Sequence, residues 1–187
     1  MDPFKYLVFY KPYGVLCSFT DAEGRVTLKN FIPVSGVYSA GRLDRDSEGL
    51  LLLSNDGELI HRLTDPKSHL PKVYLVQVEG LVKPEALTRM EQGVVIQGVR
   101  TRRCQVRAVE EPDLPPREKP ITPHGPTAWL QIELYEGKKR QIRHMTATVG
   151  LFTLRILRIA IGAITLNGLA PGEWRELTPT ELSLIQK

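Results

Sequence analysis

The sequence has few of the residues that hold metals or build disulfide frameworks. Its 187 residues include 2 cysteines, Cys17 and Cys104, and 4 histidines. Two cysteines are too few for a disulfide framework, and the histidines and cysteines are not spaced as zinc or iron ligands. We therefore expect no metal, no haem and no other cofactor. Free cysteines are usually buried, so Cys17 is interpreted as a small buried hydrophobic residue.

The sequence also lacks a long hydrophobic run. Its longest purely aliphatic segment, Leu50 to Leu53, is far shorter than the roughly 20 apolar residues of a membrane-spanning helix. The N-terminus carries no secretory hydrophobic segment, so we expect a cytoplasmic protein without a membrane partner. With 42% hydrophobic and 25% charged residues, the composition is that of a globular domain. We expect a monomer that folds as one domain, or as two small lobes sharing a core.

Acidic residues are missing from two basic stretches, residues 137–172 and 92–109. The first contains Lys138, Lys139, Arg140, Arg143, Arg155 and Arg158, and the second contains Arg100, Arg102, Arg103 and Arg107. Segregated positive charge attracts phosphate backbones without reading their sequence, so nucleic acid is the expected partner. Charge alone leaves a second interpretation open, a solvated basic face on a slightly basic protein.

Hydrophobic alternation and breaker residues predict a mixed α+β chain in which strands outnumber helices. Strands are expected at residues 6–10, 37–40, 50–54, 73–79, 129–135 and 157–161, with a basic hairpin over residues 94–109. Short helices are expected before Pro33, from an N-cap at Asn55 to Pro66, from Lys83 towards Gly93, and after Gly137. The segment Glu111 to Thr127 is rich in proline, which predicts a long surface loop.

Three carboxylates, Asp44, Asp46 and Glu48, stand close together beside Arg42 and Arg45. Surface charges that satisfy one another would explain such a cluster. The cluster lies between two predicted apolar strands, however, which would hold it at the mouth of a sheet. A carboxylate in a partly dry site needs a cationic partner to remain ionised. The basic helix expected over residues 138–144 can supply one.

Four segments resemble, in order, the motifs of the pseudouridine synthases. They are residues 10–15 with Lys11-Pro12, residues 41–53 with Gly41-Arg42-Leu43-Asp44, residues 72–74 with Lys72-Val73-Tyr74, and residues 136–143, followed by a similar terminal segment at residues 172–177. The sequence is similar in particular to the branch that modifies single uridines of ribosomal RNA. The resemblance implies a largely antiparallel, mixed central sheet flanked by helices, with an active-site cleft across the sheet.

The resemblance also implies three catalytic residues. Asp44 would be the nucleophile, Tyr74 would stack on the target base, and Arg143 would pair with Asp44. The reaction breaks the N1–C1′ bond of uridine, turns the uracil and joins C5 to C1′. The residues leave open whether Asp44 attacks C1′ or C6 or helps to remove a ribose proton. Core packing of Tyr74 and a surface phosphate contact of Arg143 are the alternative interpretations.

A further set of residues is expected to bind RNA: Arg42, Lys138, Lys139, Arg140, Arg155, Arg158 and Leu166. Arg42 is the candidate wedge that fills the space left by a flipped base, since a guanidinium stacks on bases. A salt bridge from Arg42 to Asp46 or Glu48 is the alternative. Leu166 matches a hydrophobic position under the base, although an ordinary core leucine explains it nearly as well.

The sequence departs from many members of this branch in one respect. Those members carry an additional N-terminal RNA-binding module before the Lys-Pro motif, whereas this sequence starts a few residues before it, and we expect no such module. The nearest match is therefore to large-subunit members that lack the module. The expected function is isomerisation of one uridine of 23S (large-subunit) ribosomal RNA by base flipping.

Two alternative functions stay open. The first is a catalytically silent RNA-binding or ribosome-assembly factor of the same fold, against which the combination of Asp44, Tyr74 and Arg143 argues. The second is a glycoside hydrolase, which needs two carboxylates about 5 Å or more apart across one sugar. Alternate residues of a single loop disfavour that arrangement.

Overall fold

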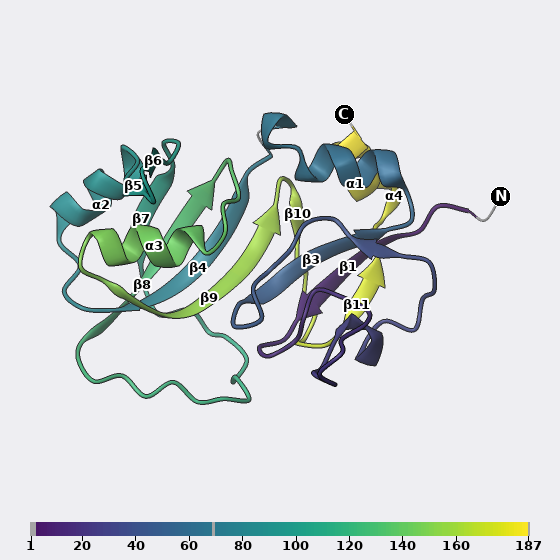
Figure 1. Cartoon of the computed structure of the whole chain (residues 1–187), viewed down its shortest axis with the longest axis horizontal. Helices are drawn as coiled ribbons and strands as arrows, with labels where there is room; N and C mark the ends of the chain where they lie inside the picture. The colour runs from purple at the N-terminus through teal and green to yellow at the C-terminus, as the bar shows by residue number, and fades with distance from the viewer. Residues whose placement is uncertain (1–2, 69, 187) are drawn as a thin grey trace.

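The computed structural model describes residues 3–68 and 70–186, in which nine strands form one mixed sheet across the molecule (Figure 1). The strands are β1 (Tyr6–Lys11), β2 (Tyr38–Ser39), β3 (Glu48–Ser54), β4 (Lys72–Glu79), β7 (Gln105–Val109), β8 (Thr127–Leu134), β9 (Phe152–Ile161), β10 (Ile164–Thr165) and β11 (Trp174–Glu176). Their order is β11-β1-β3-β9-β4-β8-β7, with β2 beside β3 and β10 beside β9. The pairs are antiparallel except β3 with β9, which confirms the predicted mixed, largely antiparallel sheet.

Helices cover different parts of this sheet. The helical elements are α1 (Gly57–Thr64), α2 (Pro84–Glu91), α3 (Gln141–Thr148) and α4 (Pro179–Gln186), with the 3-10 turns η1 (Leu28–Asn30) and η2 (Pro66–Ser68). Helix α3 lies over the part of the sheet formed by β9, β4 and β8, whereas α1 and α4 lie at the other end (Figure 1). No helix within the described residues is long and apolar enough to cross a membrane.

Strand β3 is buried on both faces, as its uninterrupted aliphatic sequence predicts. Leu50 and Leu52 pack in one hydrophobic core together with Leu59 of α1. Leu51 and Leu53 point to the opposite face and belong to a second core, which includes Phe9 of β1. Because both faces are covered, the loop that precedes β3 is fixed to a rigid central strand.

Among the predicted elements, the start of α1 and the basic hairpin differ in detail from the structure. The N-cap of α1 is Asp56, whose side chain accepts a hydrogen bond from the Leu59 backbone at 3.1 Å, and not Asn55, which instead accepts one from the Lys5 backbone. The basic region is not a single hairpin. A short hairpin, β5 (Val95–Ile96) and β6 (Val99–Arg100), turns at two residues with positive φ, and β7 then joins the main sheet beside β8.

The proline-rich loop is confirmed, because residues 110–126 contain no helix or strand. Several contacts tie the loop to the rest of the chain, including one from the His124 backbone to the Glu79 side chain, and two of them involve Pro115 and Arg117. The Pro115 carbonyl accepts a hydrogen bond from Arg155 at 3.0 Å, and the Arg117 guanidinium lies over the Tyr13 ring, 4.3 Å from its centroid. The loop therefore crosses near the segment that carries the Lys-Pro motif.

The two halves of the sheet meet where β3 and β9 pair in parallel, at Glu48 with Leu157 and at Gly49 with Arg158. Gly49 has a φ of 105°, and a Cβ added there would lie 2.2 Å from the Arg158 carbonyl oxygen. Only glycine allows the strands to approach this closely. The junction therefore places the loop that contains Asp44 directly beside β9.

A buried ion pair crosses the same junction. Arg155 of β9 donates to both carboxylate oxygens of Glu48, at 2.8 and 2.9 Å, and the two residues are 7% and 2% exposed. This contact argues against the predicted binding of RNA by Arg155. Its guanidinium neutralises a buried carboxylate and is not available at the surface.

Replacing Arg155 by methionine is expected to lower the free energy of unfolding by about 3 kcal/mol or more, because Glu48 would remain buried without its partner. Urea denaturation measures this loss. The double variant Glu48→Leu with Arg155→Met removes both charges and is expected to recover most of it. Weaker RNA binding by Arg155→Met at unchanged stability would contradict the structural role.

Candidate active site

A cavity of about 660 Å³ opens where the two halves of the sheet meet. Its walls come from the loop between β2 and β3, the end of α1, strands β4 and β9, and the segment that leads into α3. Asp44, Arg42, Tyr74, Arg140 and Arg158 all line it. The structure thus brings residues of three separate sequence motifs to one site.

Asp44 stands at the rim of this cavity, with its side chain 37% exposed. A tight turn follows it, in which the Ser47 N–H donates to the Asp44 carbonyl at 3.0 Å. On the other side, the Leu43 backbone exchanges two hydrogen bonds of 3.3 Å with the thiol of Cys17. Cys17 is only partly buried. Its hydrogen bonds hold the loop, and its side chain also packs against a hydrophobic core.

Two arginines of the α3 region face the carboxylates of the loop. Arg140 approaches both, at 3.9 Å from Asp44 and 3.2 Å from Asp46. Arg143 lies 3.1 Å from the Asp46 carboxylate and also donates to the Asp46 carbonyl. The structure therefore pairs Arg143 with Asp46, where the sequence predicts a pair with Asp44. Within the described residues, Arg140 is the cation in ion-pair range of Asp44.

These contacts define the charge state of Asp46. Burial alone would raise the pKa of the Asp46 carboxyl, but the hydrogen bond from Arg140 and the charge of Arg143 outweigh burial and lower it. Arg140 has a left-handed backbone, with a φ of 52°, and forms the N-cap of α3. Residues 138–140 thus precede the helix, whereas the basic pattern predicts them within it.

Lys11 supports the loop that carries Asp44, a role that charge alone does not indicate. Its ammonium group is fully buried and donates to the carbonyls of Pro12, Val15 and Arg45, at 2.9, 2.8 and 3.5 Å. Burial lowers the pKa of Lys11 to about 8. The Gly14 backbone also donates to the Arg45 carbonyl, at 2.8 Å. The Lys-Pro segment therefore holds the residue that follows Asp44, and its motif is the sequence signal for this role.

Tyr74 and Arg158 form the inner wall of the cavity. They lie directly opposite each other on β4 and β9, so their side chains leave the sheet on the same face. Tyr74 is 8% exposed and also belongs to a hydrophobic core. Core packing and cavity lining are therefore combined in this residue.

The remaining candidates for RNA binding divide into two groups. Arg42, Lys138, Lys139 and Arg140 line the cavity near its opening, and Arg42 and Lys139 are exposed. The ion pairs of Asp46 and Glu48 go to other arginines and not to Arg42, which favours the wedge over the salt bridge.

Leu166 belongs to the other group. It is absent from the residues that line the cavity and packs against a hydrophobic core formed in part by Val8 and Ile164. The alternative interpretation, an ordinary core leucine, describes it better. Leu70 lies at the cavity instead.

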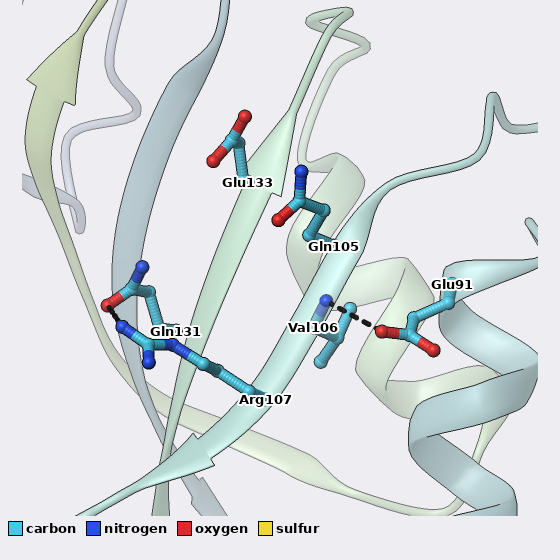
Figure 2. Close-up of a pocket in the computed structure, with 6 residues that line it drawn as sticks. All are labelled: Glu91, Gln105, Val106, Arg107, Gln131 and Glu133. Atoms are coloured by element: carbon cyan, nitrogen blue, oxygen red, sulfur yellow. Dashed lines mark hydrogen bonds between the residues drawn. The ribbon is translucent and has the colours of Figure 1, made fainter.

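A second pocket, of about 220 Å³, lies beside the basic strand β7 (Figure 2). Arg107 donates to the Gln131 side chain there at 2.9 Å, and Glu91 accepts a hydrogen bond from the Val106 backbone. Glu91 and Glu133 both line the pocket. Two carboxylates, and an arginine that already donates to Gln131, do not favour phosphate binding in this pocket. The surface around residues 92–109 is therefore not uniformly positive.

Comparison with known proteins defines the class of this site. Residues 5–148 match the family model of the RNA pseudouridylate synthases. A solved structure described as a pseudouridylate synthase superposes with a TM-score of 0.84 and 27% identity, covering 99% of this chain and 75% of the other. The chain belongs to the RNA pseudouridylate synthase family and is an isomerase with the fold of that family. This excludes the glycoside hydrolase alternative.

Curated relatives indicate which branch of the family the chain resembles. The chain is 49% identical to ribosomal large subunit pseudouridine synthase E of Vibrio vulnificus, over 93% of this chain and 75% of the relative. It is 50% identical to the synthase E of Xanthomonas campestris, over 88% of this chain and 91% of the relative. Ribosomal small subunit pseudouridine synthase A of Salmonella typhimurium is 35% identical. The resemblance to large-subunit members of the branch is thus confirmed.

Proposed function

We propose that this chain converts one uridine of large-subunit ribosomal RNA to pseudouridine, with Asp44 as the nucleophile. The observation that carries the proposal is the cavity with Asp44 at its rim and Tyr74 in its wall. Relatives named as large-subunit synthases, about half identical to this chain, support the choice of RNA. A volume of about 660 Å³ is suited to one nucleoside, since small-molecule pockets span about 300–1,000 Å³.

The target base must leave its stack to reach this cavity. Flipping costs a few kcal/mol, least for an unpaired or weakly paired base. Arg42 is exposed at the opening, where its guanidinium fills the vacated space and stacks on neighbouring bases. Lys139 and Arg140 at the same opening attract the phosphates on either side of the target.

Within the cavity, Asp44 attacks the flipped nucleotide and Tyr74 supplies a flat face for the uracil. Arg140, 3.9 Å from Asp44, orients the carboxylate by its charge. Arg143 is a positioning residue, because it holds the side chain and the backbone of Asp46 and so fixes the loop. The N1–C1′ bond breaks, the uracil turns, C5 bonds to C1′, and the proton on C5 is replaced by one on N1.

Mapping pseudouridines in ribosomal RNA from cells with and without this protein tests the proposal. We expect one large-subunit pseudouridine to disappear without the protein and to return when the purified protein is added to unmodified RNA. An unchanged large-subunit map, or a change confined to the small subunit, would refute the proposed substrate.

Lys139→Glu is expected to weaken RNA binding and to reduce the slope of log affinity against log salt concentration by about 1, because one phosphate contact is lost. Lys139 is exposed at the cavity opening and precedes α3. Lys83→Glu is the matched control, since Lys83 is also exposed but lies at the start of α2. Filter binding over a salt series measures both variants. Equal slopes for the two would place the RNA track elsewhere.

A further inference from the structure

Arg158 is a buried cation at the inner end of the cavity. It is 3% exposed and lines the cavity together with Asp44 and Tyr74. Its Nε donates to the Leu50 carbonyl at 2.7 Å, but its Nη2 has no hydrogen-bond partner among the described residues. A buried guanidinium nitrogen without a partner is costly, and such groups are rare in folded proteins. Arg62, Arg143 and Arg175 also have a buried guanidinium nitrogen without a partner among the described residues, but only Arg158 of these four lines the cavity, which indicates a donor that a bound ligand would satisfy.

The surroundings hold Arg158 in place before any ligand arrives. Gly49 lets β3 approach the Arg158 backbone, and the hydrogen bond to Leu50 fixes one edge of the guanidinium. Tyr74 is the residue of β4 that pairs with Arg158, next to a register shift in the ladder. A uracil that stacks on Tyr74 is thereby brought beside the free edge of Arg158.

Among the described residues, no carboxylate forms an ion pair with Arg158, although Asp65 and Glu136 also line the cavity and Glu136 pairs with Lys138. Lys72 also lines the cavity, and burial together with the nearby Arg158 charge lowers the pKa of the Lys72 ammonium group. The carboxylates of Asp44 and Asp46 stand at the rim, close to Arg140. Arg158 and Lys72 thus place two neighbouring cations in the cavity wall, where they favour negative charge on a ligand.

Burial distinguishes a base from a phosphate as the partner of Arg158. Phosphates follow the outside of the RNA chain and meet exposed cations such as Arg42 and Lys139 at the opening. A flipped base is the part of the nucleotide that extends inward. The oxygen acceptors of uracil are its two carbonyls, so these are the atoms that reach the inner wall.

We propose that Arg158 donates a hydrogen bond to a carbonyl oxygen of the flipped uracil and stabilises the negative charge that develops there during the reaction. The assignment rests on the proposed function, because it requires a uridine in this cavity. When the N1–C1′ bond breaks, its electron pair stays on the uracil and is shared by N1, O2 and O4. Attack of Asp44 on C6 would instead push electrons onto O4. Both routes place charge on a carbonyl oxygen, where a preorganised donor lowers the barrier.

The turn of the uracil is compatible with a fixed donor. Rotation about the axis through N3 and C6 exchanges N1 with C5 and also O2 with O4. A guanidinium that contacts one carbonyl before the turn therefore meets the other carbonyl afterwards. Arg158 can hold the detached base in either orientation without moving.

Arg158→Gln tests this role, because glutamine keeps an amide donor for the Leu50 carbonyl but removes the charge. We expect the single-turnover rate at saturating enzyme to fall at least about 100-fold, as when one oxyanion donor is removed, with RNA affinity within a few-fold. Arg158→Lys keeps the charge, so its single-turnover rate is expected to lie between those of the wild type and Arg158→Gln. It replaces Arg158→Gln in the test if the glutamine variant does not fold. Arg89→Gln, an exposed arginine of α2, is the matched control and is expected to keep the wild-type rate.

Substrates with sulfur in place of O2 or O4 at the target uridine identify the contact, because sulfur accepts hydrogen bonds poorly. The wild-type enzyme is expected to discriminate against at least one thio substrate by about 10-fold more than Arg158→Gln or Arg158→Lys does. Equal discrimination, or a loss of RNA affinity with an unchanged saturating rate, would overturn the assignment. Conversion of the unmodified RNA by the wild-type enzyme checks the proposed function separately, so an active wild type with an unaffected variant refutes only the role of Arg158.

Discussion

Asp44→Asn is expected to abolish pseudouridine formation, by at least about 10⁴-fold, while RNA affinity stays within a few-fold. The amide is nearly the same size as the carboxylate but is a far weaker nucleophile. It also leaves the basic opening of the cavity intact, so binding has no reason to fail. Single-turnover assays with saturating enzyme, combined with equilibrium binding, separate the two effects.

Asp46→Asn is the matched control, because Asp46 stands in the same loop and makes the shorter contacts with Arg140 and Arg143. Its loss should loosen the loop and slow the reaction by about 10-fold, but not abolish it, since misplacement of a reacting group costs less than its removal. If Asp46→Asn were inactive and Asp44→Asn active, the nucleophile would be Asp46, and its assignment to Asp44 would be wrong.

Gly49→Ala is expected to reduce the free energy of unfolding by about 4 kcal/mol or more, at the upper end of single substitutions. The new methyl group would lie 2.2 Å from the Arg158 carbonyl oxygen, and alanine rarely adopts a φ of 105°. The only relief is separation of β3 from β9, which also disturbs the pair of Glu48 and Arg155. Thermal and urea unfolding measure the loss.

Gly57→Ala provides the comparison for that experiment. Gly57 begins α1, has no atom within 4 Å of an added Cβ and does not adopt a positive φ. Alanine there is expected to be neutral or to stabilise the chain by a few tenths of a kcal/mol, because it favours helix. A similar loss for both variants would show that the close approach of the two strands is not the cause.

The sheet could be predicted largely from the sequence, because strand periodicity is a local property. The run of leucines in β3 requires burial on both faces, and the structure provides a core on each side. Helix ends were predicted less well. Asn55 and Asp56 are both good N-cap residues. The Asn55 side chain accepts a hydrogen bond from the backbone of Lys5, 50 residues away, and Asp56 therefore forms the N-cap.

The site was predicted less completely than the fold, since ion pairs depend on distant partners. Arg155 and Arg158 belong to the same acid-free stretch, but Glu48, which neutralises Arg155, lies 107 residues away. The distribution of charge along the sequence cannot show that Arg155 is paired with a carboxylate, whereas Arg158 has a guanidinium nitrogen without a partner among the described residues. Likewise, the family motif predicts that Arg143 meets the acidic loop, but the turn after Asp44 decides which carboxylate it faces.

The parallel pair of β3 and β9 has a consequence for how the enzyme matures. The contact between Arg158 and Leu50 joins residues 108 positions apart, and such distant pairings form slowly because a long loop must close first. During synthesis, Asp44 leaves the ribosome well before the strand that completes its cavity. A nascent chain that ends before β9 would carry Asp44 without the inner wall of the cavity, so the cavity forms only after β9 has been synthesised.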